Sequence, residues 1–166
     1  MGTRESPEVE HTEDGRHIVV DGRRWRASDP AVPERLRTEL VAELMRARRL
    51  VRTRGDEVRP MVHDAKVALG ERGEVWWGER TVDGQAVRLA STMRALLRHR
   101  DGSSICPSDA ARVAGGEHWR DLMELAREVA WTLHDEGVVV VRQGAEVASR
   151  DARGPVRVAP GPGLTR

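Results

Sequence analysis

The order of apolar patterns in the second half of the chain restricts the fold more than any other feature of the sequence. Apolar residues three and four positions apart predict helices, and short β-branched runs bounded by glycine predict strands. In chain order these patterns predict a helix at 87–99, an extended piece at 104–106, a short helix at 107–113, a long helix at 117–136, and strands at 138–142 and 155–158. This is the order of a winged helix, a helix-turn-helix variant that ends in a β-hairpin.

The first half of the chain carries the patterns of a separate small unit. Asp21-Gly22 tolerates the positive φ of a tight turn and lies between two β-rich runs, which predicts a hairpin over 17–27. A proline suited to a first helical turn, followed by apolar residues at helical spacing, predicts a helix over 33–54. A second helix is predicted over 59–72, followed by an irregular connector rich in glycine.

We therefore predict a mostly α-helical protein with small β elements, in which a hairpin and two helices pack on a C-terminal winged helix. Composition divides the chain into a disordered tail at 1–15, the hairpin and two-helix unit at 16–84, the winged helix at 85–160 and a flexible tail at 161–166. The chain has no Phe and no Tyr, so Leu, Val, Ala, Met and the five Trp must fill its core.

Three segments of the second half resemble a bacterial winged-helix family of unknown function. They are SICPSDAAR at 104–112, WRDLM at 119–123 and GPVR at 154–157. The resemblance extends over roughly 89–158 and implies the winged-helix fold, but it brings no established activity with it.

Three segments of the first half are similar to small bacterial proteins labelled Tol-type biopolymer transporters. They are GRHIVV at 15–20, RWRA at 24–27 and VHDAKVALG at 62–70. That resemblance implies a membrane component, which requires a spanning segment. The longest apolar runs of this chain, such as 138–141, are far too short to cross a bilayer.

Charge and cysteine content restrict the partners and the compartment. The 28 basic and 27 acidic residues leave a net charge of +1, so the chain as a whole shows no electrostatic footprint of nucleic-acid binding. The single cysteine excludes an internal disulfide and fits a reducing compartment. No charged-then-apolar leader begins the sequence. We expect a cytoplasmic protein that does not bind membranes.

The predicted long helix over 117–136 is the one that would enter a DNA groove. It carries two Arg against six carboxylates, a net charge of −4, and would repel phosphates. Its outward side presents Arg120, Arg127 and Trp131, and an outward indole indicates a protein partner. The helix over 33–54 has seven Arg and three Glu, a net charge of +4, which predicts that the two helices pack together and cover Trp131.

Nucleic-acid binding by a transcriptional regulator is the alternative function. Its contacts would come from the arginine-rich first helix and from the wing: Arg46, Arg48, Arg49, Arg52, Arg142, Arg150 and Arg153. The wing also carries two carboxylates, Glu146 and Asp151, so its basic surplus is small.

A small enzyme is the third alternative. Cys106 precedes a helix start, where the helix dipole activates a thiol, although a small buried residue is as consistent with the pattern. His63 and Lys66 share a helix face, and Lys66 is the only Lys of the chain. A specific ion pair or anion contact explains Lys66 as well as catalysis does. Arg112 is spaced for a local ion pair with Asp109, or for a ligand.

No motif identifies a reaction. The six His lack metal-ligand spacing, and the sequence contains no phosphate loop, nucleophile elbow or dinucleotide fingerprint. We therefore predict no catalytic residue, metal or cofactor. The function ranked first is a non-catalytic winged-helix interaction module that binds a protein partner or itself.

Overall fold

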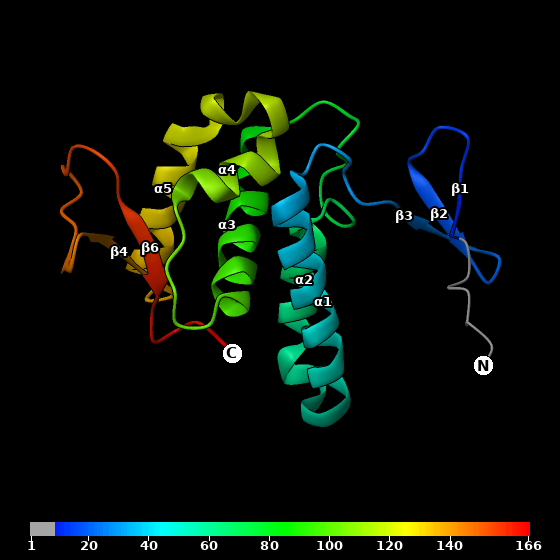
Figure 1. The fold of residues 1–166 in the computed structure, drawn as a ribbon, viewed down its shortest axis with the longest axis horizontal. Helices are drawn as coiled ribbons and strands as arrows, with labels where there is room; N and C mark the ends of the chain where they lie inside the picture. The colour runs from blue at the N-terminus through cyan, green and yellow to red at the C-terminus, as the bar shows by residue number, and fades with distance from the viewer. Residues whose placement is uncertain (1–8) are drawn as a thin grey trace.

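The computed structural model describes residues 9–166. Figure 1 shows a small sheet near the N-terminus, a central group of helices, and a second small sheet beside α5 at the opposite end of the long axis. The N-terminal sheet has the antiparallel order β1-β2-β3, with β1 at Glu10–His11, β2 at His17–Val20 and β3 at Arg23–Arg26. The C-terminal sheet has the antiparallel order β5-β4-β6, with β5 at Glu146–Val147, β4 at Val139–Gln143 and β6 at Arg157–Pro160.

Helices form most of the molecule, as predicted. In chain order they are α1 (Glu34–Arg54), the short 3-10 helix η1 (Gly55–Val58), α2 (Arg59–Ala68), α3 (Val82–His99), α4 (Pro107–Gly115), the 3-10 helix η2 (Gly116–Leu122) and α5 (Met123–Asp135). Within residues 9–166, none of them combines the length and the apolarity needed to cross a lipid bilayer.

One apolar core joins the two halves of the chain. Its largest fully buried apolar side chains come from α1, α3 and the segments that follow α2 and α3: Leu36, Leu40, Leu69, Leu89, Met93, Leu96, Leu97 and Ile105. The expectation that Trp fills this core holds in part: none of the five indoles is fully buried, but Trp119 and Trp131 pack against the core. Aliphatic side chains fill its centre, where α3 lies between the other helices and packs on α1, α2, α4 and α5.

Buried arginine–carboxylate pairs also tie the halves together. Asp64 of α2 accepts hydrogen bonds from Arg98 at 2.6 Å and from Arg94 at 2.9 Å, both on α3. Asp29 accepts one from Arg88 of α3 at 2.9 Å. Planar guanidinium groups suit such bidentate and buried pairs. Part of the arginine content of the chain therefore serves the fold itself.

The hairpin prediction is confirmed, and the structure adds a strand to it. Asp21 and Gly22 form the turn with positive φ values of 51° and 76°. Residues 1–8 of the predicted tail lie outside the described residues, whereas Glu10–His11 pairs with β2 instead of belonging to a disordered tail. The N-terminal sheet is therefore three-stranded.

Two helix boundaries differ from the predicted ones near the connector. The helix predicted over 59–72 ends as α2 at Ala68, because Gly70 takes a φ of 81° where the chain passes against Asp29. The helix predicted from Val87 begins five residues earlier, since the Thr81 hydroxyl caps it by accepting from the Gly84 N–H at 3.0 Å.

The predicted long helix over 117–136 is divided. Gly116 has a φ of 56° and His118 leaves helical geometry, so η2 precedes a shorter α5. Within α5, Arg127 stands against Glu124, Glu128 and Asp135, a net charge of −2.

The predicted flexible tail at 161–166 instead docks on the molecule. Leu164 is buried in the core. The Arg98 guanidinium donates to the Thr165 carbonyl at 2.7 Å, and the Gly163 N–H donates to the Gly137 carbonyl at 2.9 Å. The C-terminus therefore contributes to the packing around α3.

Candidate functional site

The surface predicted to bind a partner through α5 is used within the chain. The Trp131 indole is half-buried and lies 5.1 Å from both the His134 ring and the Arg150 guanidinium. Arg127 donates to two carbonyls of the loop that precedes β6, at 3.2 and 3.3 Å. Only Arg120 stays exposed, 4.5 Å from the Trp119 ring. The C-terminal loop therefore holds this face of α5.

The predicted packing of the basic helix on the acidic helix is wrong. α5 packs on α3, α4 and β4, whereas α1 packs on α2 and α3. Trp131 is covered by its own C-terminal region rather than by the N-terminal half. The halves are joined by the α3 arginines described above, so the opposite charges of α1 and α5 are not needed to unite them.

The arginines predicted to bind nucleic acid fall into separate groups. Arg46 pairs with the buried Glu43 at 2.7 Å, a hydrogen bond that raises the pKa of Arg46, and Arg150 pairs with Asp135. The remaining five are exposed, three on α1 and two on or beside the C-terminal sheet: Arg48, Arg49, Arg52, Arg142 and Arg153. Because α1 and that sheet lie in different parts of the molecule, these side chains form no single basic surface (Figure 1).

The residues predicted for chemistry are not brought together. His63 is exposed beside a hollow of about 290 Å³ that Asp64 and Arg98 also line, whereas Lys66 lines a different hollow. The Cys106 sulfur accepts a hydrogen bond from the Ser108 hydroxyl at 2.9 Å at the start of α4. Within residues 9–166, no group of three His, Cys, Asp or Glu side chains is arranged to hold a metal ion.

The predicted ion pair between Asp109 and Arg112 is not formed. Asp109 pairs instead with Arg100 at 3.1 Å and with Arg35 at 3.3 Å. The exposed Arg112 guanidinium lies 4.2 Å from the Trp119 ring, a cation–π contact. Arg112 is thus placed against an indole rather than in a cavity.

A hollow of about 440 Å³ lies between the N-terminal sheet and the first two helices, and we term it the sheet–helix hollow. Its lining comes from β2, β3, α1, α2 and the residue range just after α2: Ile18, Val20, Trp25, Arg26, Val41, Leu44, Met45, Arg48, Lys66 and Glu71. Strand pairing places Ile18 opposite Trp25, so β2 and β3 both contribute apolar side chains to it. The hollow therefore exists because the N-terminal sheet lies beside α1 and forms one of its walls.

Exposed apolar side chains gather at this hollow. Val20, Trp25, Val41 and Met45 are each 38–42% exposed. Scattered exposed apolar residues are ordinary, but a contiguous group around a concavity marks an interaction site. Val41 has the helical spacing of the apolar residues of α1, yet its side chain is partly exposed at the hollow. The spacing of apolar residues along one helix does not predict that β2 and β3 lie beside α1.

Lys66 is one of the charged residues that line this hollow. Its ammonium lies 5.5 Å from the Trp25 ring. Burial lowers the pKa of Lys66 from its ordinary value, the charges of Arg72 and Arg48 lower it further, and Glu71 opposes them. The Glu71 carboxylate accepts a hydrogen bond from the Ser28 hydroxyl at 3.0 Å.

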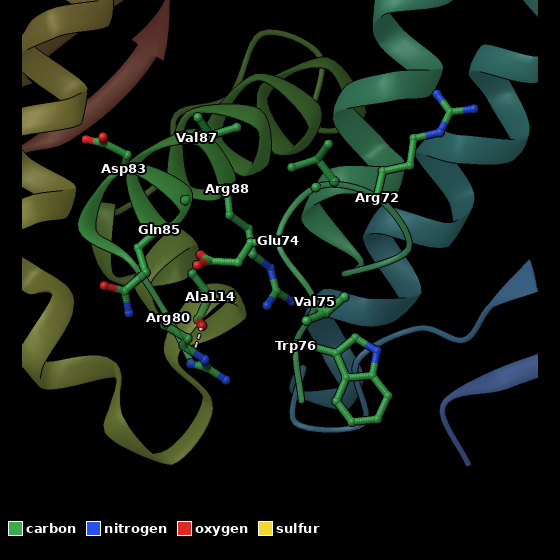
Figure 2. A pocket seen from close by; sticks show the side chains of 13 residues that line it. Arg72, Glu74, Val75, Trp76, Arg80, Asp83, Gln85, Val87, Arg88 and Ala114 are labelled. Atoms are coloured by element: carbon green, nitrogen blue, oxygen red, sulfur yellow. Dashed lines mark hydrogen bonds between the residues drawn. The ribbon is translucent and has the colours of Figure 1, made fainter. Parts of the chain in front are cut away.

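A second hollow, of about 300 Å³, lies between the connector and the start of α3. Figure 2 shows Val75 and Trp76 on one side of it and Arg80 with Ala114 on the other. Three of its five charged groups are engaged within the chain: Arg80 donates to the Ala114 carbonyl at 2.8 Å, Glu74 accepts from the Thr81 N–H at 2.7 Å, and Arg88 donates to Asp29 at 2.9 Å. These contacts hold the connector on α3 and α4 and leave the sheet–helix hollow as the stronger candidate site.

Comparison with known proteins places one part of the chain. Residues 86–160 match the model of a family described as "Protein of unknown function (DUF3253)", which covers less than half of the chain. No curated protein matches the chain. The matched range begins within α3 and ends with β6, whereas every residue that lines the sheet–helix hollow precedes it. The candidate site therefore lies outside the region that this family describes.

Proposed function

We propose that the protein is a non-catalytic interaction module that binds a protein partner at the sheet–helix hollow. The observation that carries the proposal is the gathering of four partly exposed apolar side chains around one concavity. Binding there removes apolar surface from water, which is the main driving force of protein association. His63 and Lys66 line different hollows, which supports a binding role over a catalytic one.

We also assign residues 86–160 to a winged helix that supports this site. The order α3, α4, α5 and then the C-terminal sheet supports the assignment. So does the pairing of Ile105 with Val158, whose backbone groups exchange two hydrogen bonds of 2.8 Å between the segment before α4 and β6. The acidic α5 and the internal use of Arg127 favour a protein partner over DNA for this domain.

Nucleic-acid binding remains the second candidate because of one observation. Within the part of the chain that the structure describes, Arg48, Arg49 and Arg52 of α1 form no ion pair. Titration of labelled duplex DNA at several salt concentrations tests this function. Affinity that falls steeply as salt rises would support it, since phosphate contacts release counterions.

Capture with matched variants tests the proposed function. The purified full chain is immobilised and exposed to nuclease-treated cell extract, beside a variant with Val41→Asp and Met45→Asp. The control variant carries the same substitution at Val82 and Val147, which are exposed but lie outside the hollow. We expect one or more proteins to be retained by the wild type and the control and lost from the hollow variant. Equal retention by all three would overturn the proposal.

A further inference from the structure

We infer that the sheet–helix hollow binds an acidic, apolar peptide segment of a partner protein, with apolar side chains in the hollow and carboxylates at its basic rim. This inference rests on the proposed function, which requires only that some protein binds there. It adds the chemistry of the segment that the hollow recognises.

The apolar part of the inference follows from the lining. Leu44 is buried and Ile18 is half-buried, and the partly exposed apolar side chains stand around them. A volume of about 440 Å³ lies within the range of pockets that accept small apolar groups, roughly 300–1,000 Å³. The hollow therefore accommodates a few side chains of an extended or helical segment.

The acidic part follows from the charged groups of the same lining. Arg26, Arg48 and Lys66 stand against Glu71 alone, a net charge of +2. Glu71 is already engaged by Ser28. Within residues 9–166, neither Lys66 nor Arg48 forms an ion pair with a carboxylate. A partner carboxylate would meet two cations that form no ion pair within residues 9–166.

Lys66 gains most from such a carboxylate. Its ammonium is partly desolvated and has other cations, Arg48 and Arg72, as neighbours, which is why its pKa is lowered. A carboxylate at the rim would offset that repulsion and raise the pKa of Lys66 again. The Trp25 ring, which lies 5.5 Å from the Lys66 ammonium and 4.3 Å from the Arg23 guanidinium, lines the same hollow.

A nucleic-acid backbone fits this site less well. Phosphates would use Lys66 and Arg48 but would leave Val41 and Met45 in water, whereas an acidic, apolar segment uses both kinds of group. The peptide is therefore the occupant that the whole lining favours.

The test is a selection of displayed random 12-residue peptides on the immobilised full chain. We expect the selected peptides to combine Leu, Ile, Phe or Trp with Asp or Glu. One of them, synthesised with a fluorescent label, is then titrated by anisotropy at physiological salt. Selected peptides that are basic, or that carry no acidic residues, would overturn the inference, as would a selection that yields none.

Two charge-reversal variants with the same change in net charge locate the contact. Lys66→Glu with Arg48→Glu alters the rim, and Arg49→Glu with Arg52→Glu alters α1 outside the hollow. We expect the rim variant to weaken peptide binding at least about tenfold. The control is expected to stay within about twofold, because its exposed side chains do not line the hollow and exposed charge pairs contribute little. Equal losses in both variants would mean general attraction and would overturn the inference.

A charge swap and a test of self-association complete the experiment. The peptide with its Asp and Glu changed to Lys is expected to bind the rim variant better than the wild type, which a merely misfolded variant would not do.

Sedimentation velocity of the chain alone is expected to show no association mediated by the hollow. Association abolished by Val41→Asp with Met45→Asp would assign the hollow to a second copy and overturn the inference. Capture of a partner at the hollow without acidic peptides would refute the inference alone and leave the proposed function standing.

Discussion

The two sheets are both three-stranded and antiparallel, but they differ in which side chains they bury. β4 and β6 turn Val139, Val141 and Val158 into the common core. No residue within β1, β2 or β3 is fully buried. The C-terminal sheet is thus part of the core of the protein, whereas the N-terminal sheet forms one wall of a hollow and presents apolar side chains to it.

The N-terminal sheet is attached by its edge and by two indoles of the connector. Trp76 donates to the Ala27 carbonyl at 3.0 Å, and the Trp77 ring lies 5.5 Å from the His17 ring. The Arg26 guanidinium donates to the Gly73 carbonyl at 2.9 Å. These few contacts hold the sheet beside α1 without sealing it onto the helices. The N-terminal sheet is thus fixed in position, while its apolar side chains at the hollow stay partly exposed and can contact a partner.

The same substitution in the two sheets gives the largest expected contrast. Val141→Asp places an unpaired charge in the core, so we expect it to lower the free energy of unfolding by about 4 kcal/mol or more. Val20→Asp lies on the exposed wall of the hollow, and we expect a change within about 0.5 kcal/mol. Urea unfolding followed by circular dichroism measures both. Similar losses for the two variants would remove the distinction between the sheets.

The sequence predicted two strands of each sheet, but neither β1 nor β5. The Asp21-Gly22 turn between two β-rich runs identified the hairpin, and β-branched runs identified β4 and β6. Whether such a strand faces a core or a hollow depends on residues far away in the chain, here Trp76 and Trp77 of the connector. Local patterns contain no information on that placement.

The candidate site shows the same limit. The sequence singled out Lys66 because it is the only Lys, but paired it with His63 by helical spacing. Trp25, whose ring lies 5.5 Å from the Lys66 ammonium, is 41 residues away in the chain and is brought near it only by the fold. Spacing along a helix also cannot predict long-range ion pairs, such as that between Asp64 and Arg98. Residue type could indicate the importance of Lys66, but only the fold identifies its neighbour.

Removing the attachment of the N-terminal sheet is expected to have the next largest effect. Trp76→Ala deletes a half-buried indole and its hydrogen bond, so we expect a loss of about 1–3 kcal/mol, below the roughly 3–5 kcal/mol of a fully buried Trp. Hydrogen exchange is expected to accelerate in β2 and β3 while β4 and β6 stay protected. Faster exchange in both sheets would show that they share one cooperative unit.

A smaller effect is expected where α5 holds the C-terminal loop. Arg127→Ala removes hydrogen bonds to the Ala152 and Gly154 carbonyls, and we expect a loss of about 1 kcal/mol with faster exchange near those residues. Arg142→Ala is the matched control, because Arg142 is exposed on β4. Equal effects of the two substitutions would contradict a specific role of α5 in fixing the loop.

The smallest expected effect concerns pH and the hollow itself. Because burial and neighbouring cations lower the pKa of Lys66 in the folded chain below its ordinary value of 10.5, the unfolded chain binds its proton more tightly. The Lys66 contribution to stability therefore rises as pH increases through the folded pKa towards 10.5. Lys66→Met lacks this group, so its stability relative to wild type is expected to decline as pH rises over that window. The amine is partly open to solvent, which screens and limits the change.

Urea unfolding of both chains at several pH values from neutral to about 10.5 measures this difference. Adding a saturating acidic peptide selected on the hollow sharpens the test, because a bound carboxylate stabilises the charged amine. The peptide is expected to raise the folded pKa of Lys66 and to flatten the pH dependence of the difference. A difference that is flat without the peptide would show that Lys66 is not desolvated. If the peptide leaves this pH dependence unchanged, its carboxylates do not lie near Lys66. Peptide binding in the hollow would then not depend on the charge of Lys66.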